Sequence, residues 1–227
     1  MVDAVVLDWE GVLADTGAAR RHALACALAD EGLQADDAML ASCSDSMSLH
    51  SAIASVLRDA RPADATLADL LALRASRAFA ERLGKGFVLA PGAREFVEGV
   101  EVHAPVAIVT SATRSETEFV LRLAGLDAGI ATIVSADDST QTKTGAAHRE
   151  AVARLARRRA VSASRVVALA CVAETLDGAR RAGVRTIAVG AAAHVALHAD
   201  GAVDSVQGLA VADLARLAGI AAVEQRS

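Results

Sequence analysis

The sequence predicts an α/β protein in which a parallel sheet, covered by helices on both faces, is interrupted after its first strand by a helical insertion. Two observations support this prediction. From Pro105 onward, short apolar runs alternate with helical stretches, as in sheets whose parallel strands are joined by helices. Between Asp15 and Gly86, apolar residues instead recur at intervals of three and four, and no convincing strand is present.

The first strand is expected at Val2–Leu7, an apolar run that is broken only by Asp3. The later strand-like runs are Pro105–Thr110, Ala131–Ser135, Val166–Ala170, Arg185–Val189 and, more weakly, Ala202–Val206. The helices expected between and after them are Glu116–Ala124, Ala146–Arg158, Ala173–Ala182 and Ala210–Leu217. The Ala-rich stretch Gly190–Ala199 is expected to be a loop that contains a helix.

The insertion contains residues that start and end helices, in addition to apolar residues at helical spacing. Asp45 and Asp64 are suitable N-caps, and Gly32 and Gly84 are suitable helix ends. The return to the sheet is marked by the turn-forming residues Gly86, Pro91 and Gly92. We therefore expect residues 1–14 and 88–227 to form the sheet domain, with residues 15–87 inserted as a helical unit.

Composition narrows the class of protein. The chain has 227 residues, 53% of them hydrophobic, with one Trp, four Phe and no Tyr, so its core must be largely aliphatic. No apolar run reaches the roughly 18 residues of a membrane span, and no signal-peptide pattern opens the chain. The net charge of −5 and the scattered Arg residues show no nucleic-acid footprint. We expect a soluble cytoplasmic protein that binds neither nucleic acid nor membrane.

Two carboxylates follow the first strand at the position where open α/β sheets bind their ligands. Asp8 ends the apolar run, Glu10 comes two residues later, and Gly11 allows the chain to turn. A carboxylate there can act as a nucleophile, and a second one can carry a proton. The alternatives are ordinary ones: Asp8 as a turn or N-cap residue, and Glu10 as a solvated loop residue.

The segment Asp8–Asp15, Asp-Trp-Glu-Gly-Val-Leu-Ala-Asp, resembles the first motif of the haloacid dehalogenase (HAD) superfamily, Asp-x-Asp-Gly-Thr/Val-Leu-x-Asp. The element order is similar to that of members with a small helical cap, such as phosphoglycolate phosphatase and beta-phosphoglucomutase. The resemblance implies a Rossmann-like core, a cap at residues 15–87 and a small phosphorylated substrate. It also implies that Asp8 forms an aspartyl-phosphate and that Glu10, which replaces the second Asp, acts as general acid and base.

The second and third family motifs have counterparts here. Thr110 ends the second expected strand and would bind the phosphoryl group together with neighbouring groups, which we assign to Ser111 and Gly11. Lys143 stands where the family keeps a Lys, although both prolines of the usual Lys-Pro-x-Pro are absent. Among the 23 basic residues only Lys85 and Lys143 are lysines. The use of Lys instead of Arg at position 143 indicates that a compact point charge is needed there.

The fourth motif departs from the family. Counting back from Gly183 places Ala170 and Cys171 where the family has its metal-binding acids. Mg²⁺ prefers oxygen ligands, so a thiol serves it poorly. The resemblance implies Asp8 and the backbone carbonyl of Glu10 as metal ligands. The nearest acid that could replace the missing ones is Glu174, which could reach back one helical turn. The other nearby acid is Asp177. We expect Mg²⁺ as the cofactor, bound weakly if it binds.

Three interpretations stay open at this stage. The chain can be a working phosphatase or phosphomutase, a HAD-fold protein with an impaired metal site, or a metal-independent haloacid dehalogenase. The scarcity of aromatic residues disfavours the dehalogenase, and Lys85 is poorly placed for the Schiff base of a phosphonoacetaldehyde hydrolase. Polar candidates for substrate selection in the cap are Ser44, Asp45, Ser46, His50 and Arg58. The sequence discloses neither the substrate nor the oligomeric state.

Overall fold

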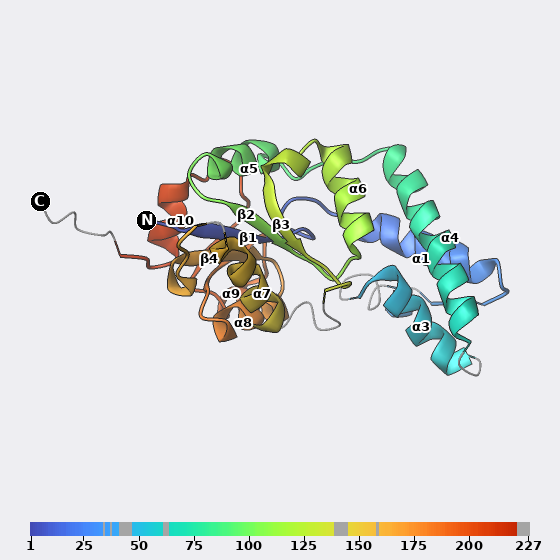
Figure 1. Ribbon diagram of the computed structural model, residues 1–227. Helices are drawn as coiled ribbons and strands as arrows, with labels where there is room; N and C mark the ends of the chain where they lie inside the picture. Colours follow the sequence, from blue (N-terminus) through green and yellow to red (C-terminus); the bar gives the residue numbers. More distant parts are fainter. Residues whose placement is uncertain are drawn as a thin grey trace, which may run out of the picture.

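A six-stranded parallel sheet forms the centre of the molecule (Figure 1). The computed structural model describes residues 1–33, 35–36, 38–40, 47–60, 64–138, 145–157 and 159–221. The strands are β1 (Ala4–Asp8), β2 (Val106–Val109), β3 (Ile130–Val134), β4 (Val166–Ala170), β5 (Arg185–Val189) and β6 (Gly201–Val203). Their order in the sheet is β3-β2-β1-β4-β5-β6, which confirms the predicted parallel α/β architecture.

Helices cover both faces of the sheet because side chains alternate along each buried strand. In β1, Val5 and Leu7 belong to the core that α5 (Ala93–Glu101) and α10 (Val211–Leu217) cover. Ala4 and Val6 face the opposite core, beneath α7 (Gly145–Ala156) and α8 (Ala173–Arg181). Figure 1 shows α5 above the sheet and α7 and α8 below it.

The element bounds agree closely with the pattern in the sequence. The structure gives β4 and β5 their expected limits, whereas β6 ends at Val203, three residues early. Helix α6 (Arg114–Ala124) begins two residues early because Thr113 and Glu116 form a capping box at its start. The remaining short elements are the helix α9 (Ala193–Ala196) and the 3₁₀ turns η1 (Asp127–Gly129) and η2 (Ala163–Arg165).

Three described helices lie between β1 and α5 and pack on one another: α1 (Gly17–Ala29), α3 (Leu49–Ala60) and α4 (Ala65–Gly84). We call them the helical insertion. Asp64 caps α4 by accepting a hydrogen bond from the Leu67 amide at 3.0 Å, as expected, while Asp45 lies outside the described residues. Between residues 15 and 86, the described segments contain no β-strand. The exact domain boundaries at residues 15 and 87 stay a prediction.

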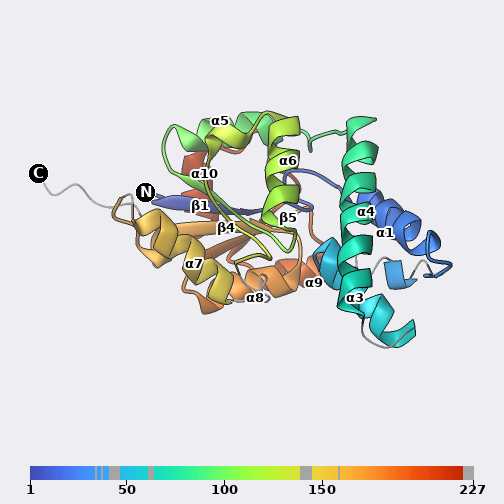
Figure 2. The same cartoon turned by 45° about the vertical axis from the view of Figure 1, so that its right-hand side comes forward.

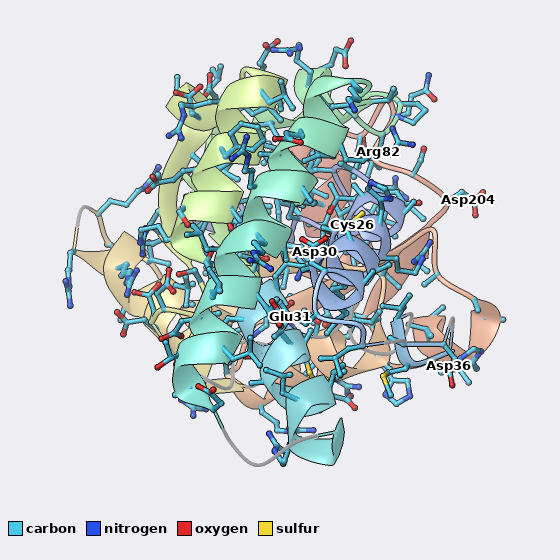
Figure 3. All side chains as sticks on the ribbon, turned by 90° about the vertical axis from the view of Figure 1, so that its right-hand side faces the viewer. Cys26, Asp30, Glu31, Asp36, Arg82 and Asp204 are labelled. Carbon is cyan, nitrogen blue, oxygen red and sulfur yellow. The ribbon has the colours of Figure 1, made fainter. Side chains whose placement is uncertain are left out.

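The helical insertion extends from one end of the sheet (Figure 2). Its two longest helices are joined by charge as well as by apolar packing. Arg74 of α4 contacts Glu31, just after α1, at 3.1 Å. Figure 3 shows Asp30 and Glu31 beside α4 at the end of α1. No helix in the described part of the chain is both long and apolar enough to span a bilayer.

The strand order decides which chain segments meet. Because β1 lies between β2 and β4, the residues that follow these three strands gather at one edge of the sheet. Asp8 is opposite Val109, so the next residue, Thr110, lies beside it. Leu7 is opposite Leu169, which brings the segment after β4 to the same edge.

Candidate active site

Asp8 is the last residue of β1 and is almost fully buried, with 4% of its surface exposed. The buried hydroxyl of Thr175, in the first turn of α8, donates a hydrogen bond to its Oδ2 atom at 3.4 Å. Asp8 thus lies within the strand and neither caps a helix nor opens to solvent. A carboxylate held in this way presents its oxygens at the ligand-binding edge of the sheet.

A tight turn follows β1. The Trp9 carbonyl accepts hydrogen bonds from the amides of Leu13 and Ala14, at 3.1 and 3.3 Å, and the Gly11 amide donates back to the Ala14 carbonyl at 2.9 Å. Gly11 has a φ of 74°, a left-handed conformation that glycine adopts without steric cost. The turn keeps Asp8, Glu10 and the Gly11 amide close together.

The Glu10 carboxylate is turned toward the start of α1. One of its oxygens accepts a hydrogen bond from the Thr16 amide at 3.1 Å, and the other accepts one from the Thr16 hydroxyl. Burial raises the pKa of Glu10 above its ordinary value, and the hydrogen bonds from Thr16 and the charge of Arg20 offset only part of this shift. Glu10 is therefore not the solvated loop residue that the sequence left possible, and it holds its proton more tightly than a free Glu.

Thr110 and Ser111 lie at the end of β2, and both are buried. The Thr110 Oγ1 atom accepts a hydrogen bond from the Ala112 amide at 3.1 Å, which fixes the hydroxyl in place. This hydroxyl still has its own proton to donate. The structure therefore brings Asp8, Glu10, Gly11, Thr110 and Ser111 to one edge of the sheet, and their roles there stay a prediction.

Cys171 directly follows β4 and packs against the turn after β1. Its thiol donates a hydrogen bond to the Glu10 backbone carbonyl at 3.4 Å. A Cβ atom built on Gly11 would lie only 2.2 Å from the Cys171 sulfur. The thiol therefore covers the carbonyl oxygen that the motif resemblance assigned to a metal.

The donor atoms at this edge do not fit a tight Mg²⁺ site. Ala170 and Cys171 supply no carboxylate, and a soft thiol is a poor ligand for this hard cation. Glu174, in the first turn of α8, has an exposed side chain, and Asp177 contacts His198 at 3.0 Å. Among the described residues, no group of three or more His, Cys, Asp or Glu side chains is placed to hold a metal ion. Ligation by Glu174 stays a prediction.

Lys143 lies outside the described residues, so its approach to Asp8 also stays a prediction. The segment that leads toward it is anchored by Asp138, whose carboxylate accepts hydrogen bonds from the Ser135 amide, Arg114 and Arg154. Burial acts to raise the pKa of Asp138, but the hydrogen bonds from Arg154 and Ser135 outweigh it and lower the pKa to about 2. The end of β3 is therefore fixed by a permanent negative charge at neutral pH.

Comparison with known proteins decides the family. A model of the family described as haloacid dehalogenase-like hydrolase matches residues 5–189 of this chain. The chain belongs to the haloacid dehalogenase-like hydrolases. The matched range runs from β1 to the end of β5 and includes the whole helical insertion. No match was found among curated protein sequences.

Solved structures of other HAD proteins share the fold over almost the whole chain. CbbY from Rhodobacter sphaeroides, solved with phosphate, is 23% identical, with a TM-score of 0.79 over 94% of this chain and 99% of CbbY. The beta-phosphoglucomutase of Clostridium difficile is 16% identical, with a TM-score of 0.79 over 96% and 98% of the two chains. The HAD-hydrolase YfnB of Bacillus subtilis, solved with magnesium, is 17% identical, with a TM-score of 0.62 over 83% and 89%.

Several residues that shape this candidate site carry no motif signal in the sequence. Thr16 looks like a helix N-cap, yet its hydroxyl binds Glu10. Thr175 follows Glu174, and no pattern in the sequence indicates that its hydroxyl contacts Asp8. Arg20 is 3% exposed and precedes Ala23, Leu24 and Ala27 by three, four and seven residues, so its position on the buried stripe of α1 could have been detected.

The polar candidates in the insertion have varied outcomes. His50 is exposed and contacts Asp69 at 2.9 Å, and Arg58 is exposed on α3. Ser44, Asp45 and Ser46 lie outside the described residues.

A cavity of about 830 Å³ lies at the opposite edge of the sheet, next to Met1 and Val2, and none of the motif residues lines it.

Replacing Gly11 with Ala is expected to destabilise the protein more than the same change at Gly32. Both glycines have positive φ, which costs an L-residue roughly 1–2 kcal/mol. The new Cβ at Gly11 meets the Cys171 sulfur, whereas among the described residues no atom lies within 4 Å of a Cβ at Gly32. Gly11→Ala should therefore cost roughly 1–3 kcal/mol more. Urea unfolding of the single variants and of Gly11→Ala/Cys171→Ala measures this. Equal losses at Gly11 and Gly32, with no recovery in the double variant, would contradict the close thiol contact.

Proposed function

We propose that the protein transfers a phosphoryl group from a small phosphorylated metabolite to Asp8 and then to water or to a second hydroxyl of the substrate. The observation that carries this proposal is the convergence of the buried Asp8 carboxylate, Glu10 and the Thr110 hydroxyl at one edge of the sheet. The solved relatives support a phosphorylated substrate, since one was crystallised with phosphate and another is a phosphoglucomutase.

In the first step, an Asp8 oxygen attacks phosphorus and the bond from phosphorus to the substrate oxygen breaks. The departing oxygen takes a proton from the Glu10 carboxyl. Its raised pKa suits this role, because a carboxyl that keeps its proton longer is a better general acid near neutral pH. Donation requires the Glu10 side chain to turn from Thr16 toward the substrate.

In the second step, a water molecule attacks the aspartyl-phosphate and Glu10 takes up the proton that the water loses. Asp8 is regenerated and inorganic phosphate leaves; when a substrate hydroxyl attacks instead, the reaction is a phosphomutase reaction. The Thr110 hydroxyl and the Ser111 side chain bind the phosphoryl oxygens. The Gly11 amide already donates to the Ala14 carbonyl, so Gly11 contributes by shaping the turn beside the phosphoryl group. Lys143 supplies the positive charge that balances Asp8 and the phosphoryl group.

The helical insertion acts as the cap that selects the substrate and excludes water from this edge of the sheet.

A second candidate function is supported by the Cys171 thiol, which covers the Glu10 carbonyl. HAD hydrolases generally use Mg²⁺, and one solved relative was crystallised with it. A protein that binds this ion weakly could serve as a phosphate-ester binding module with little turnover.

Asp8→Asn is expected to abolish hydrolysis of an aryl or sugar phosphate, because an amide cannot form the acyl phosphate. Glu10→Ala should lower kcat by about 10²–10⁴, the usual range for loss of a general acid. Asp204→Asn, in the exposed loop after β6, is the matched control and should leave the rate unchanged. Phosphate release is measured for all three. Hydrolysis by Asp8→Asn at the wild-type rate would show that another residue is the nucleophile.

The wild-type protein is expected to bind Mg²⁺ weakly, on the order of millimolar, because affinity falls with the number of charged ligands. Cys171→Asp should bind the ion more tightly and raise any phosphatase rate. Cys26→Asp, which adds the same charge on the exposed face of α1, should do neither. Calorimetric titration and activity are measured in parallel. Tight binding and rapid turnover in the wild type would instead assign a ligand role to Glu174, and Mg²⁺-independent halide release from a 2-haloacid would contradict both functions.

A further inference from the structure

One buried ion pair joins the helical insertion to the sheet domain. Arg20 lies on α1 of the insertion, and Glu116 lies in the first turn of α6, which packs on the sheet side. Their side chains are 3% and 4% exposed, and the Arg20 Nη1 and Glu116 Oε2 atoms are 3.7 Å apart. Charged groups are rarely buried so completely, so this junction requires an explanation.

Further parts of the insertion meet at the same place. The Ser76 hydroxyl of α4 donates a hydrogen bond to the Glu116 Oε1 atom at 3.3 Å. Arg20 also donates to the Met47 carbonyl at 2.6 Å, and its guanidinium lies 5.8 Å from the centre of the Phe79 ring of α4. Two helices of the insertion thus contact one carboxylate of the sheet domain. Figures 1 and 2 both show α4 alongside α6.

The Glu116 carboxylate is fixed from its own side as well. It accepts a hydrogen bond from the Thr113 amide at 3.1 Å, and Thr113 caps the same helix in return. This capping box works with either Glu or Gln at the third helical position. The negative charge of Glu116 is therefore not needed for the helix cap, and its contribution at the junction can be tested separately.

A buried ion pair has an energetic property that suits a reversible contact. The cost of removing two charges from water nearly cancels their attraction, so the closed pair is only weakly favoured. When the two sides separate, both charges regain water. An apolar contact of the same size would lack this compensation, since separation would expose its surface at full cost.

We propose that Arg20, Glu116 and Ser76 form a latch that holds the helical insertion against the sheet domain and releases it when the ion pair separates. The latch is coupled to the candidate active site along α1. Thr16, which holds the Glu10 carboxylate, lies one helical turn before Arg20, so a displacement of α1 moves both contacts. The latch can exist whether or not the protein is an active enzyme. That its release admits substrate to the candidate site rests on the proposed function.

The protein carries its own reporter of this motion. Trp9, its single Trp, is 4% exposed and stacks on Phe87, in the segment that returns from the insertion, with ring centres 6.2 Å apart. Release of the latch should loosen this stack and admit a quencher. Glu116→Gln, which keeps the helix cap but removes the charge facing Arg20, should increase acrylamide quenching of Trp9. It should also speed amide hydrogen exchange in α1 and α4 by at least about tenfold, since removing one member of a buried pair is strongly unfavourable.

Matched variants separate the latch from a general loss of stability. Glu118→Gln removes a partly exposed charge from the same helix, where Glu118 contacts Arg122 at 3.8 Å, and should behave like the wild type. Arg20→Met/Glu116→Gln carries neither charge and should return quenching and exchange to wild-type levels or below. In Glu116→Gln, amides of β1 and β4 should exchange at the wild-type rate.

Two results would overturn the latch. In the first, Trp9 quenching and amide exchange in Glu116→Gln equal those in Glu118→Gln. In the second, amide exchange in Glu116→Gln is faster by the same factor in the strands and in the insertion, and Arg20→Met/Glu116→Gln does not return it to the wild-type rate. If Glu116→Gln does not fold, Ser76→Ala provides the test: it should raise Trp9 quenching to a smaller extent, and unchanged quenching would overturn the proposal. None of these measurements needs turnover, so inactivity of the wild type would count against the proposed function and leave the latch standing.

Discussion

The chain turn after β1 is the constraint on which the whole candidate site depends. It closes through the Trp9 carbonyl and a left-handed Gly11, directly beyond a buried Asp8. Because β1 lies between β2 and β4, this turn meets Thr110 on one side and Cys171 on the other. Asp8, Thr110 and Cys171 are thus brought together by three neighbouring strands, without a long loop.

The same crowding explains why the departures from the family pattern belong together. The Cys171 sulfur fills the space above Gly11 and hydrogen-bonds the Glu10 carbonyl, so a weakly polar group takes the place of a charged one. Glu10 is longer than the Asp of the family motif, and its carboxylate reaches Thr16 at the start of α1. The Glu10 and Cys171 side chains therefore both make polar contacts with other groups of the protein.

Much of this arrangement could be predicted from sequence. Apolar runs and their alternation with helices predicted the limits of β4 and β5, and the motif residues Asp8 and Thr110 end neighbouring strands at one edge of the sheet. The tertiary partners could not be predicted in the same way. Nothing local to Thr175 indicates that its hydroxyl turns to Asp8, and the Arg20–Glu116 contact joins residues that are far apart in sequence. Such contacts depend on how α1, α6 and α8 are placed in space, which spacing along the chain does not specify.

The central claim is that Asp8 becomes phosphorylated. It is tested most directly by acid-quenching the protein with a small phosphate donor, reducing with borohydride and sequencing the peptides by mass spectrometry. Borohydride converts an aspartyl-phosphate to homoserine, so the position of the intermediate is read as a mass change. We expect homoserine at position 8 in the wild type, in larger amount in Cys171→Asp, and none in Asp8→Asn. Homoserine at another Asp, the corresponding reduced alcohol at a Glu, or turnover with no homoserine at position 8 in either protein would contradict the claim.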